Sequence, residues 1–188
     1  MSYVTSSGLQ DARLALRARK NCGILYQLSQ AQTEDRQNHM QVAQFTRDMF
    51  RILCEKLELP YDIDEDGDYR LGLAADDLVT WPMRVYLVAA GSANDILDIR
   101  IDTTREFPSS EWGRAMLACN EWNDTTRWPK AYLHVNDPGA TEPGKVVCEG
   151  SLDLENGIHQ ELLENYILTV IARSRAFWRW LKEEKGFI

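Results

Sequence analysis

The spacing of apolar residues switches between the helical and the strand period along this chain, and these switches limit its possible folds more than any other feature. Apolar residues recur every three or four positions at about 33–59, 109–123 and 158–181. Five shorter segments between them alternate apolar and polar residues. The predicted order is helix, three strands, helix, two strands, helix. Because each strand has one polar face, we expect an α+β fold with an antiparallel sheet covered by helices on one side.

The first helix is predicted to begin at Thr33, whose hydroxyl can cap it, and to stop at Pro60. The second is predicted to open at Ser109 and to end near Asn123. The expected core-facing residues are Val42, Phe45, Met49, Ile52 and Leu53 in the first helix, Trp112, Ala115, Met116 and Cys119 in the second, and Leu163, Tyr166, Ile167, Val170, Ile171, Phe177 and Trp178 in the third.

The strands are predicted from their alternation, and Gly91 to Asn94 reads as a hairpin turn between the second and third strands. A loop rich in proline and glycine, 137–144, separates the last two strands. The expected inward residues are Tyr69, Leu71, Leu73, Val85, Leu87, Ala89, Leu97, Ile99, Ile101, Ala131, Leu133, Val135, Val146, Cys148 and Leu152.

The length of the chain fits one ordinary domain and an extension. Of its 188 residues, 44% are apolar, which is enough for one core. We predict an appended, partly helical arm at residues 1–32 and a domain at residues 33–188. The arm is less regular, because Gly8 and Gly23 interrupt its apolar spacing.

The charge of the chain is acidic and restricts its partners. A net charge of -8 repels phosphate backbones and anionic lipids, so direct binding to nucleic acid or to a membrane is not expected. No apolar run reaches the roughly 18 residues of a spanning helix. The four cysteines contain no CxxC pair and no export signal precedes them, which predicts reduced thiols and a cytoplasmic location.

One stretch carries a family resemblance, namely Asn120-Glu121-Trp122-Asn123 followed by Arg127-Trp128-Pro129-Lys130-Ala131-Tyr132. Together with the segments 57–61 and 150–154, it resembles the YbjN family of bacterial sensory-transduction regulators over about residues 41–180. The resemblance implies a fold like that of type III secretion chaperones, which often form dimers. It further implies a regulatory or chaperone-like binding role, often linked to stress responses, and it offers no catalytic residues.

The acidic turn contains Asp62, Asp64, Asp66 and Gly67, which copy the first half of an EF-hand calcium loop. The second half fails, because the glutamate expected at loop position twelve would fall on Leu73. We therefore favour a solvated hairpin turn. The alternative is a domain that senses an ion or a small ligand through the loop from Asp62 to Asp68.

Residues for catalysis or cofactor binding are not arranged in any recognisable motif. The histidines His39, His134 and His159 lie on separate elements without metal-ligand spacing. The chain has no GxSxG elbow and no GxxxxGK phosphate loop. We expect no enzyme activity, no bound metal and no cofactor, and an unrecognised hydrolase has almost no support.

The signature residues Asn120, Trp122, Asn123 and Trp128 lie where the second helix gives way to the fourth strand. Their amides could bind unpaired backbone groups at the helix end, while the two indoles plug the edge of the sheet. A structural role is the preferred interpretation, and contact with a ligand is the alternative.

The closing helix carries the only basic and aromatic patch of the chain, which includes Arg175, Trp178, Arg179 and Trp180. Because Phe177, Trp178 and Trp180 cannot all face one stripe, at least one ring could serve a protein partner or a homodimer, and packing at the chain end is the alternative. Single-stranded nucleic acid is disfavoured by the net charge. We predict a non-catalytic protein-binding module that buries an apolar segment of an unidentified partner.

Overall fold

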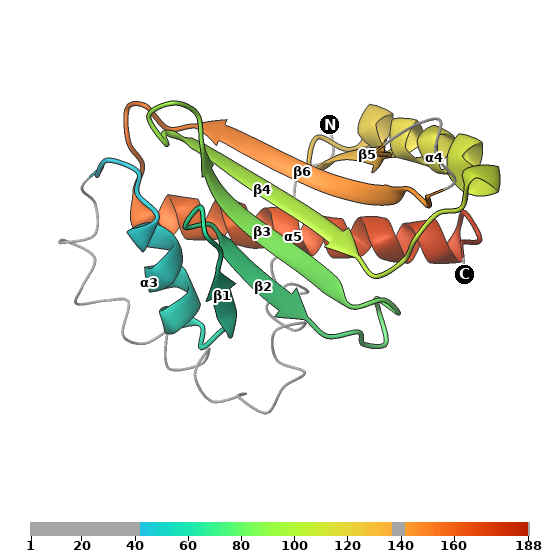
Figure 1. Cartoon of the computed structure of the whole chain (residues 1–188), viewed down its shortest axis with the longest axis horizontal. Coiled ribbons are helices and arrows are strands. Elements are labelled where there is room, and N and C mark those ends of the chain that lie inside the picture. Colours follow the sequence, from blue (N-terminus) through green and yellow to red (C-terminus); the bar gives the residue numbers. More distant parts are fainter. Residues whose placement is uncertain (1–41, 137–141, 188) are drawn as a thin grey trace.

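The computed structural model describes residues 42–136 and 142–187, which form a six-stranded antiparallel sheet and three α-helices (Figure 1). The elements follow in the order α3 (Asp48–Lys56), β1 (Tyr61–Ile63), β2 (Tyr69–Leu73), β3 (Met83–Ala90), β4 (Ile96–Thr103), a 3-10 turn η2 (Ser109–Glu111), α4 (Trp112–Thr125), β5 (Lys130–His134), β6 (Lys145–Asp153) and α5 (Gln160–Glu183). The predicted α+β class and antiparallel sheet are confirmed. The predicted arm at 1–32 and the start of the first helix at Thr33 lie outside the described residues.

The strands lie in the order β1-β2-β3-β4-β6-β5. The chain leaves β4, forms α4, reaches the edge with β5 and returns with β6 between β4 and β5. On the covered face, the alternate residues Val85, Leu87, Ile99, Ile101 and Cys148 are fully buried. The alternation from which the five predicted strands were inferred therefore marks the core.

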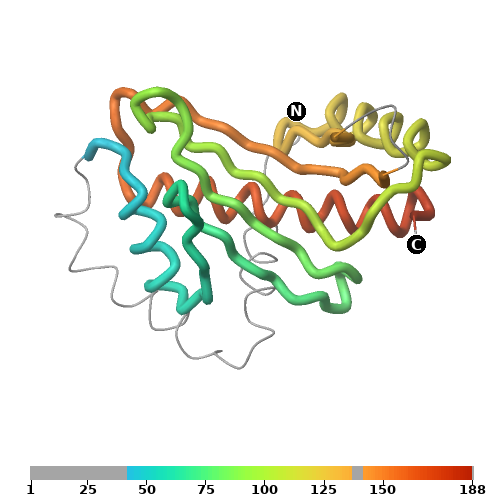
Figure 2. The backbone as a smooth tube through the Cα atoms, viewed as in Figure 1, coloured from blue at the N-terminus to red at the C-terminus, as the bar shows by residue number. Residues whose placement is uncertain are grey.

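Helix α5 covers this face and runs behind the sheet along most of its length (Figure 2). It lies close to β6 because Gly150 has no side chain, since a Cβ there would lie 2.9 Å from Cγ2 of Val170. Helix α3 packs against the same face, where the ring of Phe50 meets that of Tyr69 edge-on at 5.6 Å. The sheet is thus covered by helices on one face.

The first helix is shorter than expected and part of its predicted stripe is wrong. Val42 precedes the helix and is 58% exposed, because the neighbouring residue Ala43 pairs with Ile158 as an isolated bridge. Ile52 is 38% exposed. The helix ends at Lys56 and not at Pro60, because Glu58 adopts a left-handed conformation (φ 51°) that a helix cannot continue.

Two further differences concern β1 and α4. Strand β1 was not predicted, because three residues are too few for alternation to be recognised. In α4, Met116 is 50% exposed, whereas Ala118 and Trp122 join Ala115 and Cys119 in the core. The buried stripe is therefore rotated from the predicted one. Among the helices described, none combines the length and the apolar character needed to cross a membrane.

Candidate functional site

Asn123 lies near the end of α4 and caps the outer edge of β5 at Ala131. Its Oδ1 accepts a hydrogen bond from the backbone N–H of Ala131 (2.8 Å), and its Nδ2 donates to the carbonyl oxygen of the same residue (2.9 Å). One amide thus satisfies two outward backbone groups, as a neighbouring strand would. The partner of Asn123 is the sheet edge, and not the helix end that the sequence suggested. Asn120 is exposed.

The two tryptophans of the signature occupy different environments. Trp122 is 8% exposed, donates from Nε1 to the carbonyl oxygen of Pro129 (3.2 Å) and packs edge-on against Phe177 at 5.3 Å. Trp128 is 38% exposed and meets Tyr166 edge-on at 6.0 Å. Trp122 therefore fixes α4 to α5 beside β5, whereas Trp128 lies at the surface.

The expected partner surface on α5 is divided between core and surface. Trp178 is fully buried, with its ring 5.9 Å from that of Trp81, and Arg175 is 5% exposed and paired with Asp76. This burial corrects the expectation for Arg175 and Trp178, because buried groups present no surface to a partner. Arg179 and Trp180 remain partly exposed.

Asp76 explains why an arginine lies inside. One carboxylate oxygen of Asp76 accepts hydrogen bonds from the N–H groups of Leu78 and Val79, both at 2.9 Å, and the other accepts from Arg175. Burial alone would raise the pKa of Asp76, but the Val79 N–H and the Arg175 guanidinium outweigh it and lower the pKa. The pair joins the loop before β3 to the middle of α5.

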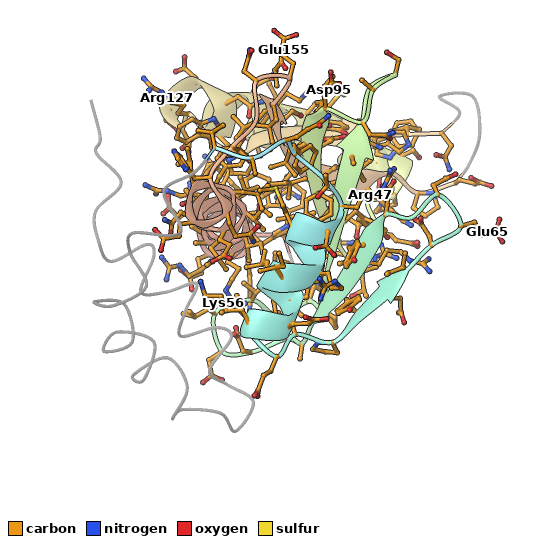
Figure 3. The ribbon with its side chains drawn as sticks, turned by 90° about the vertical axis from the view of Figure 1, so that its left-hand side faces the viewer. Arg47, Lys56, Glu65, Asp95, Arg127 and Glu155 are labelled. Atoms are coloured by element: carbon orange, nitrogen blue, oxygen red, sulfur yellow. The ribbon has the colours of Figure 1, made fainter. Side chains whose placement is uncertain are left out.

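The acidic turn between β1 and β2 uses one carboxylate to hold its own backbone. Oδ1 of Asp64 accepts from the N–H groups of Asp66 (3.1 Å) and Asp68 (2.9 Å), while Gly67 supplies a positive φ of 84°. Asp68 in turn pairs with Arg47 at 3.2 Å. Glu65 lies at the outer tip of the turn, on the side away from α5 (Figure 3). Within 42–136 and 142–187, no group of three His, Cys, Asp or Glu residues could hold a metal ion.

The second face of the sheet carries a row of polar residues in register across all six strands. The row consists of Asp62, Arg70, Tyr86, Arg100, Glu149 and Lys130. Figure 3 shows α5 end-on beside the strands, on the side opposite this face. We call the outward residues of the strands on this side the open face.

Ion pairs between and along strands hold most charges of the open face. Arg84 binds the carboxylate of Asp102 through two nitrogens at 2.7 and 2.8 Å. Glu149 accepts from Lys130 (2.9 Å) and from the hydroxyl of Tyr132 (2.7 Å). Burial would raise the pKa of Glu149, but these two donors outweigh it and lower the pKa, so this carboxylate stays charged at neutral pH.

Apolar surface remains between these pairs. Tyr86 and Val88 of β3 and Val147 of β6 are half-buried and lie on the open face, with β4 between the two strands. A sheet face that combines partly exposed apolar groups with paired charges suits contact with a polypeptide, because the charged groups fix register while the apolar groups are covered.

Comparison with known proteins identifies a family and several structures with a similar fold, of which two are described here. Residues 46–183 match the model of the YbjN family, described as "Putative bacterial sensory transduction regulator". The fold is similar to the crystal structure of YbjN from E. coli, "a putative transcription regulator", with a TM-score of 0.61 and 14% identity over 77% of this chain and 97% of that chain. An uncharacterized protein from Methanothermobacter thermautotrophicus has a TM-score of 0.43 and 13% identity over 76% of this chain and 100% of that chain. No curated protein matches.

Proposed function

The chain belongs to the YbjN family, whose members are described as regulators, and from this premise we propose that it is a regulatory or chaperone-like protein that binds another polypeptide without catalysing a reaction. We place this role in the bacterial cytoplasm, in stress or signalling responses. The fold related to type III secretion chaperones, which the sequence suggested, belongs to the same proposal.

The open face is the observation that carries this proposal. Its partly exposed residues Tyr86 and Val88 of β3 and Val147 of β6 flank the charged residues of β4, and no helix among the described elements covers them. A partner segment could bury these groups and exchange contacts with the surrounding ion pairs.

The three cysteines in the described part of the chain are poorly suited to nucleophilic chemistry. Cys54, Cys119 and Cys148 are buried. Burial raises the pKa of the Cys54 thiol to about 11 and that of Cys119 to about 12, so neither supplies a thiolate at neutral pH.

Affinity capture from the native bacterium with a matched pair of variants tests the proposal. Val88→Lys places a long cation on the open face, and Leu162→Lys makes the same change at a 57% exposed position of α5. We expect a reproducible protein partner with wild type and with Leu162→Lys, and loss of that partner with Val88→Lys. Equal capture by all three proteins would show that the open face does not bind the partner. A co-purified metal or nucleotide would point to ligand sensing instead.

We extend the proposal to a homodimer, for which the outer side of α4 offers the best surface. Met116 is 50% and Leu117 71% exposed there, and a Cβ at the nearby Gly113 would meet no atom within 4 Å. A second copy could therefore approach closely and cover both side chains. Sedimentation velocity should give a dimer that Leu117→Glu dissociates and Leu162→Glu does not; a wild-type monomer would contradict it.

A further inference from the structure

Among the described residues, the outer edge of β1 has backbone groups without a hydrogen-bond partner. The N–H of Asp64 donates to the carbonyl oxygen of Asp68 at 3.0 Å, which makes these two residues a hydrogen-bonded pair. Because such pairs alternate along antiparallel strands, Asp62 forms the next one with β2. Tyr61 and Ile63 therefore direct their N–H and C=O groups away from the sheet.

No described group fills this edge. Strand β1 is the last strand of the sheet, and within 42–136 and 142–187 no backbone or side-chain hydrogen bond outside the strand ladder reaches Tyr61 or Ile63. The side chain of Ile63 is 51% exposed. Pro60 does not block the edge, since its missing N–H would face β2 and not the outside. The edge can accept a further strand.

The charge around β1 selects the kind of strand. Asp62, Glu65 and Asp66 are exposed, and Asp64 lies between them in the same turn. A second copy of β1 would place these carboxylates against their own equivalents, which opposes pairing between two copies. A segment with Lys or Arg residues would instead form opposite-charge pairs.

We propose that a basic, extended segment of a partner protein adds to the sheet beside β1, as a seventh strand. Successive side chains of the added strand would point to opposite faces of the sheet. Basic residues would lie beside Asp62 on the open face, and apolar residues would lie beside Tyr61 and Ile63 on the covered side. The segment therefore alternates basic and apolar residues. This inference deepens the proposed function and rests on it.

A labelled peptide, acetyl-Lys-Val-Lys-Val-Lys-amide, tests the inference with the full chain. We expect anisotropy to report binding that weakens with salt, and amide NMR shifts to concentrate at Tyr61 and Ile63. Ile63→Pro removes an outward N–H without breaking a ladder bond and should weaken binding at least about tenfold. Ile63→Val keeps the N–H and should bind like wild type, and both variants should melt near the wild-type temperature.

Two control peptides separate backbone pairing from charge. A peptide N-methylated at its valines keeps every charge but loses donors, so it should bind at least about tenfold more weakly. A peptide with Glu in place of Lys should not bind. Equal binding of the N-methylated peptide, shifts centred on the open face or on β5, or no binding of the parent peptide would each overturn strand addition at β1.

Capture with Ile63→Pro distinguishes the failure of this inference from the failure of the proposed function. A partner lost with Val88→Lys but retained with Ile63→Pro would leave the binding role intact and overturn the edge proposal. A partner lost with Ile63→Pro, but retained with Ile63→Val, would support it. Self-association that Ile63→Pro abolishes would identify a second copy as the occupant and overturn the basic-segment proposal.

Discussion

The two edges of the sheet are treated differently by the same chain. At β5, one side chain from α4, Asn123, binds both outward backbone groups of Ala131. At β1, the outward groups of Tyr61 and Ile63 have no such partner among the described residues. An exposed edge invites pairing with other chains. Among the described residues, a side chain thus caps the β5 edge at Ala131, which we call the closed edge, whereas the β1 edge has no such cap and is the one that we propose for strand addition.

At the open edge of β1, the short strand and the nearby acidic side chains limit unwanted pairing, since no described element covers this edge. Strand β1 has three residues, and it leads into a turn that contains Asp64, Glu65 and Asp66. Short strands and charged side chains both limit edge-to-edge aggregation. The same carboxylates that favour a basic segment therefore disfavour a second copy.

The largest effect should come from the aromatic support of the closed edge. Trp122→Ala removes a ring that is 8% exposed and that packs on Phe177, so we expect a loss of roughly 3 kcal/mol or more in the free energy of unfolding. Urea denaturation measures it. Trp128→Ala, at a ring that is 38% exposed, should cost clearly less. An unchanged urea midpoint for Trp122→Ala would contradict the buried assignment.

Opening the closed edge directly should have a smaller effect. Asn123→Ala deletes both hydrogen bonds to Ala131 and should cost about 1 to 2 kcal/mol. The exposed β5 should also promote self-association at high concentration. Asn120→Ala, at an exposed position of the same helix, should stay within about 0.5 kcal/mol of wild type. Equal effects of the two substitutions would show that the edge is not held by Asn123.

A proline placed at each edge should sharpen the contrast. Ile63→Pro should change the free energy of unfolding by less than about 1 kcal/mol, because the lost N–H faces outward and has no described partner. Ala131→Pro removes an N–H that donates to Asn123, so it should cost more. Chemical denaturation of the two variants compares them, and a larger loss for Ile63→Pro would mean that β1 pairs outward after all.

The acidic turn should give the smallest effect. Because the Asp64 carboxylate accepts two backbone N–H groups, we expect millimolar calcium to leave the melting temperature unchanged. A calcium-dependent rise that Asp64→Asn abolishes would restore the ion-sensing alternative. Asp124→Asn, at an exposed acid on α4, serves as the control.

The covered face could be predicted from the sequence because burial on one side imposes period two on long strands. Val85, Leu87 and Ile99 follow that period and are fully buried. Sheet order could not be read in the same way, since nothing local tells β6 to lie between β4 and β5. The period of apolar residues therefore cannot show which strands form the edges of the sheet. It cannot show where a partner strand could add either.

Single side chains were harder to place where their partners are distant in sequence. Arg175 reads as a surface cation, yet its carboxylate partner Asp76 lies 99 positions away and draws it inside. Asn123 was singled out as part of the family signature, but its amide was expected to bind the helix end, whereas its partner is Ala131 in the next strand. Met116 is exposed and Ala118 is buried, so helical spacing alone did not show which side of α4 faces the core.

Residue-resolved amide hydrogen exchange tests the difference between the edges most directly. The account predicts slow exchange for the N–H of Ala131, which donates to Asn123, and fast exchange for the N–H groups of Tyr61 and Ile63. In Asn123→Ala, the N–H of Ala131 should become as fast as that of Ile63. Strong protection of Tyr61 and Ile63 in the free protein, or fast exchange of Ala131 in wild type, would contradict the account.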